Sequence, residues 1–132
     1  MAESQPHQVS YSEVANLLYI QPENLAYGDD QFHQAEYWHQ ESTSLVVLIH
    51  GGCWLNQFDL KHIRPLASDI ANQGIAVLSI EYRRIGDPGG GWPGTFDDIR
   101  QALGFASEMP FENLFVVGHS AGGHLALWSN AT

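Results

Sequence analysis

The sequence predicts an α/β protein with a mostly parallel sheet and helices on both of its faces. Three segments are rich in β-branched residues and leucine, which is typical of strands buried on both faces: 44–50, 75–82 and 113–118. Each is followed by a segment with apolar residues at helical spacing: 59–73, 96–108 and 121–130. Strands that alternate with helices in this way form right-handed crossovers within a parallel sheet.

The segment before these runs is predicted to hold one short helix and two strands, at 10–18, 25–28 and 33–39. Ser10 and Glu13 have the spacing of a capping box, which marks the start of a helix. Asp29 and Asp30 supply the turn between the two strands. We expect one partial domain, with a lead-in over 1–23 and a sheet core over 24–132.

Several residues predict where the helices begin and end. Pro65 lies inside the 59–73 pattern, so it kinks this helix or marks its true start. Gly74 ends the helix, and Thr95 and Asp98 are expected to cap the next one, with Asp97 as a second acidic residue in its first turn. The face of the 59–73 helix expected in the core consists of Leu60, Ile63, Leu66, Ala67 and Ile70.

Composition excludes several classes of partner. The 132 residues carry a net charge of −10, and no lysine or arginine occurs before Lys61, so nucleic acid and anionic membranes would be repelled. The first residues lack the features of a signal or transit peptide, and no run is apolar enough to span a bilayer. A single cysteine, Cys53, fits a reducing compartment, so we expect a cytoplasmic location. No metal-ligand spacing and no phosphate loop are present, so neither a metal nor a cofactor is expected.

The pentapeptide G-H-S-A-G, residues 118–122, predicts a nucleophilic serine. It lies between a strand and a helix, the context that the G-x-S-x-G motif requires. A serine at such a sharp turn has a strained backbone, and Gly118 and Gly122 remove side chains that would clash with it. Ser120 would then lie at the carboxyl end of the sheet, where the N–H group of Ala121 can stabilise an oxyanion. Taken alone, the pentapeptide also fits an ordinary turn.

A second motif, H-G-G-C-W at 50–54, directly follows the first buried strand. It resembles the H-G-G-x-W oxyanion-hole loop of esterase-type α/β-hydrolases. The resemblance implies that Gly52 and Cys53 donate N–H groups to the oxyanion, while His50 shapes the loop through hydrogen bonds.

Together the motifs resemble the N-terminal half of an α/β-hydrolase, closest to the esterase, kynurenine formamidase and feruloyl-esterase-like branch. The stretches that carry the resemblance are L-I-H-G-G-C-W, S-I-E-Y-R-R, G-G-G-W-P-G-T-F-D-D and V-G-H-S-A-G-G-H-L-A-L-W. It implies a carboxylic ester or small amide as substrate and an acyl-Ser120 intermediate. Gly51 and His119 would support the loop and the serine turn, and Trp54 and Trp92 are candidates for an apolar pocket wall.

The catalytic acid and base are the missing parts. In α/β-hydrolases both follow the serine along the chain, but His124 is the only histidine after Ser120 and no acid follows it. His124 is expected to pack in or beside the core, and His119 to point elsewhere on the turn. His124 or His50 as base, and Cys53 as nucleophile, remain weaker alternatives.

The strand at 113–118 would have one bare edge, and an apolar edge strand is prone to pairing. We therefore expect either a complementing C-terminal segment or a homo-oligomer to cover it. Two function hypotheses follow: a serine hydrolase whose acid and histidine come from sequence outside this chain, or a non-catalytic relative serving as an assembly or binding module. A peptidase of the prolyl-oligopeptidase kind is a third possibility.

Overall fold

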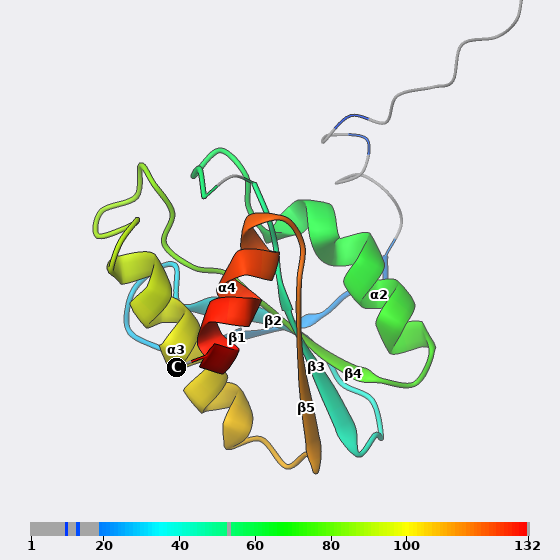
Figure 1. Cartoon of the computed structure of the whole chain (residues 1–132). Helices are drawn as coiled ribbons and strands as arrows, with labels where there is room; N and C mark the ends of the chain where they lie inside the picture. Colours follow the sequence, from blue (N-terminus) through cyan, green and yellow to red (C-terminus); the bar gives the residue numbers. More distant parts are fainter. Residues whose placement is uncertain (1–9, 11–12, 14–18, 53, 132) are drawn as a thin grey trace, which may run out of the picture.

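The computed structural model describes residues 10, 13, 19–52 and 54–131. In this part of the chain five strands form one sheet in the order β1-β2-β4-β3-β5 (Figure 1). The strands are β1 (Glu23–Ala26), β2 (Gln34–Trp38), β3 (Ser44–Ile49), β4 (Ala76–Ile80) and β5 (Asn113–Gly118). A 3-10 turn and three α-helices connect or follow them: η1 (Leu60–Ile63), α2 (Arg64–Asn72), α3 (Gly94–Ser107) and α4 (Ala121–Ala131).

The sheet is mixed, and its parallel part is the part that the sequence predicts best. Strand β3 pairs in parallel with both β4 and β5, as expected for strands joined by helical crossovers. Strand β2 instead runs antiparallel to β1 and to β4. The β1–β2 connection is a short turn, which only antiparallel neighbours permit.

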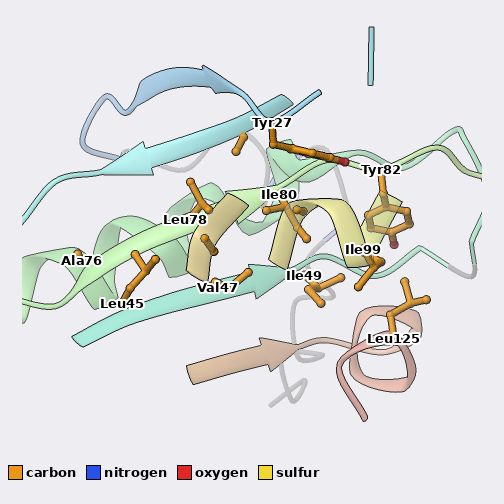
Figure 2. Packing of buried hydrophobic residues seen from close by; sticks show 13 residues of the cluster. Tyr27, Leu45, Val47, Ile49, Ala76, Leu78, Ile80, Tyr82, Ile99 and Leu125 are labelled. Atoms are coloured by element: carbon orange, nitrogen blue, oxygen red, sulfur yellow. The ribbon is translucent and has the colours of Figure 1, made fainter. Parts of the chain in front are cut away.

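Helices cover both faces of the sheet, which confirms the α/β prediction (Figure 1). On one face, η1 and α2 pack Leu60, Ile63 and Ala67 against Leu48 and Val77. On the other face α3 and α4 cover a larger cluster, in which Figure 2 shows Ile99 and Leu125 beside the apolar side chains of β3 and β4. Burial on both faces is the reason that β3 and β4 are apolar at almost every position.

The helical segment after β3 begins differently from its prediction. Asp59 caps the 3-10 turn by accepting a hydrogen bond from the Lys61 N–H at 2.9 Å, and α2 starts only at Arg64, with Pro65 in its first turn. Pro65 therefore marks a true start, one of the two expected outcomes. Since the 3-10 turn and α2 are two separate helical pieces, their apolar faces do not continue one into the other. Leu66 is 48% exposed, so the prediction that it lies in the core is wrong.

The predicted caps of the helix at 96–108 are also wrong. Helix α3 begins at Gly94, and no side chain caps it. Thr95 donates its hydroxyl to the Arg83 carbonyl, and the buried Asp98 carboxylate binds the Arg83 guanidinium and His33 instead of the helix end. Asp97 lies exposed in the first turn, where the helix dipole favours an acid.

Strand β5 is not buried, contrary to the expectation drawn from its composition. It is an edge strand, and Leu114, Phe115 and Val117 are 39%, 54% and 42% exposed. Helix α4 adds the exposed Leu127 to the same side of the molecule. An apolar edge without charged residues has none of the features by which edge strands usually avoid pairing.

The predicted helix at 10–18 lies largely outside the described residues. Ser10 and Glu13 do form the reciprocal capping-box contacts: the Glu13 N–H donates to Ser10 Oγ at 3.2 Å, and the Ser10 N–H donates to a Glu13 carboxylate oxygen at 2.9 Å. Among the described helices, none has the length and apolar content needed to span a bilayer.

Two glycines should respond oppositely to replacement by alanine. Gly104 lies inside α3 with open space at its Cβ position, so Gly104→Ala should raise the free energy of unfolding by about 0.5–1 kcal/mol. Gly74, which follows α2, has a φ of +88°, so Gly74→Ala should lower it by about 1–2 kcal/mol. Urea denaturation of the two variants checks this, and shifts of the same sign would contradict the expected difference.

Candidate active site

The serine turn lies between β5 and α4. Ser120 has a φ of +55°, a strained value for a residue with a side chain, and it is exposed. A Cβ at Gly118 would lie 2.0 Å from the Gly122 carbonyl oxygen, and a Cβ at Gly122 would lie 2.1 Å from the Ile49 carbonyl oxygen. Only glycine at both positions therefore leaves room for the turn.

The H-G-G-C-W loop lies directly beside this turn. Because β3 and β5 are parallel neighbours with Ile49 opposite Gly118, the residues after each strand meet at the same edge of the sheet. The His119 N–H donates to the Ile49 carbonyl at 3.1 Å, and a Cβ at Gly51 would lie 2.9 Å from Ser120 Cβ. Two motifs that are about 70 residues apart in the sequence thus form one site.

The donors expected for an oxyanion hole are placed as follows. Ala121 is the first residue of α4, so its N–H has no acceptor within the helix and lies at the positive end of the helix dipole. Gly52 has a φ of +125°, and its Cβ position is blocked by Phe58. Cys53, the third expected donor and the alternative nucleophile, lies outside the described residues.

His50 is fully buried and bridges the loop to the sheet. Its Nδ1 lies 2.8 Å from the Gly51 carbonyl oxygen, and its Nε2 lies 2.5 Å from a carboxylate oxygen of Glu81. The ring stacks on Tyr82 at 4.6 Å, and the Tyr82 hydroxyl donates to the His50 carbonyl at 2.8 Å. With both ring nitrogens engaged in these contacts, His50 is placed to fix the loop rather than to take a proton from Ser120.

The structure adds a histidine that no motif pointed to. The His62 ring lies 5.7 Å from that of His50 and 6.3 Å from that of His119. Its Nδ1–H donates to the Asp59 carbonyl at 2.7 Å, which fixes the tautomer. Burial and the neighbouring His50 lower the pKa of His62, so it is neutral at pH 7. Only the fold brings these rings together, since His62 belongs to a different element from each of the others.

His124 lies beside the core rather than in it, one of its two expected positions, because its ring contacts Trp54 and Phe96, which pack against the core. It is exposed on the first turn of α4, where its ring lies 5.7 Å from that of Trp54 and 6.1 Å from that of Phe96. Its backbone N–H donates to the Ser120 carbonyl at 3.2 Å. Within the described residues, no hydrogen bond joins the Ser120 hydroxyl to a histidine.

Trp54 and Trp92, the expected pocket wall, line the same small cavity next to this site. No group of three or more histidine, cysteine, aspartate or glutamate residues in the described part of the chain could hold a metal ion.

The sheet, its crossovers and the serine turn at the strand ends define the α/β-hydrolase fold. More specifically, the chain belongs to the BD-FAE family, whose family model matches residues 34–132.

Known proteins of this class are similar over most of the chain. Esterase LipC of Mycobacterium tuberculosis is 27% identical over 127 residues, which is 86% of this chain and 30% of LipC. A thioesterase candidate from a Silicibacter species is 30% identical with a TM-score of 0.69, over 87% of this chain and 44% of that one. An esterase from the archaeon Pyrobaculum calidifontis shares the fold at 23% identity and a TM-score of 0.66, over 88% of this chain and 40% of the archaeal one. The chain therefore spans less than half the length of each of these relatives.

Proposed function

We propose that this chain is the nucleophile-bearing part of a serine hydrolase that cleaves carboxylic esters or small amides. The observation that carries the proposal is the contact between the two motifs: Ser120, with its positive φ, lies directly against Gly51 of the H-G-G-C-W loop. The similarity to LipC, an esterase, supports an ester rather than an amide as the substrate.

In the proposed reaction Ser120 Oγ attacks the substrate carbonyl carbon and passes its proton to a base. The carbonyl oxygen becomes an oxyanion, which accepts hydrogen bonds from the N–H groups of Gly52, Cys53 and Ala121. Collapse of this intermediate breaks the bond to the alcohol, which leaves with a proton from the base. Water then attacks the acyl-Ser120 ester by the same steps and releases the acid.

We propose that the base and its acid partner come from sequence outside these 132 residues. The greater length of the relatives and the absence of a histidine hydrogen bond to Ser120 among the described residues both support this. The same complementing segment, or a second copy of the chain, would cover the exposed edge of β5. A natural protein that consists of these 132 residues alone and sediments as a free monomer at high concentration would contradict this proposed cover of β5.

Labelling by a fluorophosphonate probe tests the function. We expect the natural protein, isolated with any longer polypeptide or co-purifying piece, to be labelled, and Ser120→Ala to abolish the labelling. Ser107→Ala, at the exposed end of α3, is the control and should label as the wild type does. Intact mass of the natural product identifies a longer chain or a second piece.

A well-folded natural protein that does not react would overturn the proposal. It would favour the second candidate, a non-catalytic assembly or binding module, for which the exposed apolar edge of β5 is the supporting observation. The cytoplasmic location stays a prediction, which fractionation of the source cells would test.

A further inference from the structure

The buried His50, directly after β3, has an oxygen atom at each of its two ring nitrogens. Its Nδ1 lies 2.8 Å from the Gly51 carbonyl oxygen, and its Nε2 lies 2.5 Å from a carboxyl oxygen of Glu81. A carbonyl oxygen can only accept a hydrogen bond, so Nδ1 must carry a proton. The charge of His50 therefore depends on whether the proton in the second contact belongs to Nε2 or to Glu81.

The surroundings of Glu81 place that proton on the histidine. The carboxyl oxygen that contacts His50 also accepts the Tyr82 N–H at 3.1 Å, and the other oxygen accepts the Leu60 N–H at 3.2 Å. The Arg84 guanidinium lies 3.6 Å from the first oxygen. Hydrogen bonds from backbone N–H groups and a nearby positive charge both favour the ionised form of a carboxyl group. Both nitrogens of His50 then donate, which only the imidazolium cation can do.

A second buried histidine has a different hydrogen-bond pattern. His33 Nε2 lies 2.7 Å from a carboxylate oxygen of Asp98, much as His50 contacts Glu81. Its Nδ1, however, accepts the Asp30 N–H at 3.1 Å, so this nitrogen has no proton and the ring is neutral. The two histidine–carboxylate pairs therefore differ in charge, because the backbone group that faces Nδ1 is a donor in one pair and an acceptor in the other.

Two further titratable side chains face the His50 ring within the described part of the chain, and both are uncharged at pH 7. The His62 ring of η1 lies 5.7 Å away, and burial together with His50 lowers the pKa of His62. The Tyr82 ring stacks on His50 at 4.6 Å, and burial raises the pKa of Tyr82. The ionised Glu81 is therefore the direct counter-charge of the imidazolium.

The imidazolium acts on the H-G-G-C-W loop through one peptide group. The Gly51 carbonyl that accepts the Nδ1–H of His50 belongs to the same peptide as the Gly52 N–H, one of the expected oxyanion donors. A positive charge at the carbonyl end polarises this peptide and makes its N–H a stronger donor. A donor that is strengthened before the reaction stabilises the charge that develops on the oxyanion.

We propose that Glu81 holds His50 as an imidazolium cation, and that this buried charge strengthens the Gly52 N–H as an oxyanion donor. Glu81 and His50 are positioning residues in this sense, because they act through the peptide between Gly51 and Gly52. The inference rests on the proposed function, since it assigns a role to two more side chains of the same site.

Nuclear magnetic resonance of isotope-labelled histidine in the natural protein tests the charge at pH 7 without turnover. The chain has seven histidines, and His50→Gln and His33→Gln assign the two signals by their loss. We expect a proton on both ring nitrogens of His50 and on Nε2 alone of His33. Glu81→Gln keeps the shape without the counter-charge, so His50 should then carry a proton on Nδ1 alone. A single proton on His50 of the wild type, or two protons in Glu81→Gln, would overturn the proposal.

The rate of fluorophosphonate labelling tests the effect on the oxyanion, because attack by Ser120 develops negative charge on the phosphonate oxygen. Glu81→Gln should lower the second-order rate constant by about tenfold, less than the roughly hundredfold to thousandfold loss on removal of an oxyanion donor. The control is Asp98→Asn, which removes the carboxylate of the other pair and should label at the wild-type rate. A wild-type rate for Glu81→Gln, or an equal loss in Asp98→Asn, would overturn the proposal.

The two measurements separate this inference from the proposed function, because protonation of His50 needs no nucleophile. A wild type that has two protons on His50 but is not labelled would overturn the proposed function and, with it, the role of the charge at the oxyanion. Labelling of a wild type whose His50 is neutral would overturn this inference alone.

Discussion

Glu81→Ala should lower the free energy of unfolding by about 3–5 kcal/mol, the usual cost of breaking a buried ionic contact. The Glu81 carboxylate accepts hydrogen bonds from the Leu60 N–H at 3.2 Å and the Tyr82 N–H at 3.1 Å, in addition to the 2.5 Å contact with His50. The Arg84 guanidinium lies 3.6 Å away. Alanine would leave several buried donors unpaired at once, and each of them carries its own desolvation cost.

Urea denaturation measures this loss. Glu81→Gln keeps the shape and an acceptor oxygen, so we expect a smaller loss than for alanine. The control is Glu112→Ala, which removes an exposed carboxylate next to β5 and should change stability by less than about 0.5 kcal/mol. Equal effects of Glu81→Ala and Glu112→Ala would show that the buried contacts do not stabilise the fold.

Asp98→Ala should lower the free energy of unfolding by a similar amount, again about 3–5 kcal/mol. Asp98 is fully buried, and its carboxylate accepts the Arg83 backbone N–H at 2.8 Å and the Arg83 guanidinium at 2.8–3.1 Å. His33 Nε2 lies 2.7 Å away. One side chain thus joins the β1–β2 turn, the segment after β4 and helix α3.

The contribution of Asp98 should depend on pH. Burial alone raises the pKa of its carboxyl group, but the hydrogen bonds from Arg83 and His33 and the charge of Arg83 outweigh burial and hold the pKa below its usual range. A pKa that is lower in the folded state gives stability that is complete above the unfolded pKa of about 4 and disappears as pH falls through the folded value. The stability difference between wild type and Asp98→Ala should therefore narrow below about pH 4.

Asp97→Ala is the matched control, one residue earlier in α3. Asp97 is exposed, and its interaction with the helix dipole should contribute about 0.3–1 kcal/mol. Urea unfolding of the wild type and both variants, repeated between pH 3 and pH 7, provides the comparison. A difference for Asp98→Ala that stays constant down to pH 3 would contradict the role of its ionised carboxylate.

The sequence predicts the central part of the fold well because burial on both faces leaves a strong local pattern. Strand β3 begins where its apolar run begins, and β4 lies within its predicted bounds. Strand β5 matches its predicted bounds at both ends, but the same apolar pattern misjudges its burial, because β5 lies at the edge of the sheet and is largely exposed. Prediction fails where a side chain has a distant partner. Asp98 has the spacing of a helix cap, but Arg83 and His33 engage it, and His33 lies 65 residues away.

In the candidate site, too, the local features could be predicted from the sequence and the contacts between distant residues could not. Ser120 and the H-G-G-C-W loop could be identified from the sequence, because glycines at fixed spacing indicate a sharp turn. The pairing of His50 with Glu81, 31 residues later, has no such local signal. His62 was missed for the same reason, because it comes near His50 and His119 only when the sheet has formed.

The glycines of this chain differ in which atoms would clash with an added side chain, and this difference decides which of them can be replaced during evolution. At Gly118 and Gly122 the nearest obstacles are main-chain carbonyl oxygens, which every residue type carries, so no second-site change can make room for a side chain. At Gly28 the nearest obstacles are the side chains of Gln101 and His33. A side chain at Gly28 can therefore be accommodated only if both of these neighbours become smaller or move. The two glycines around the serine cannot be replaced in this way for as long as the turn is kept.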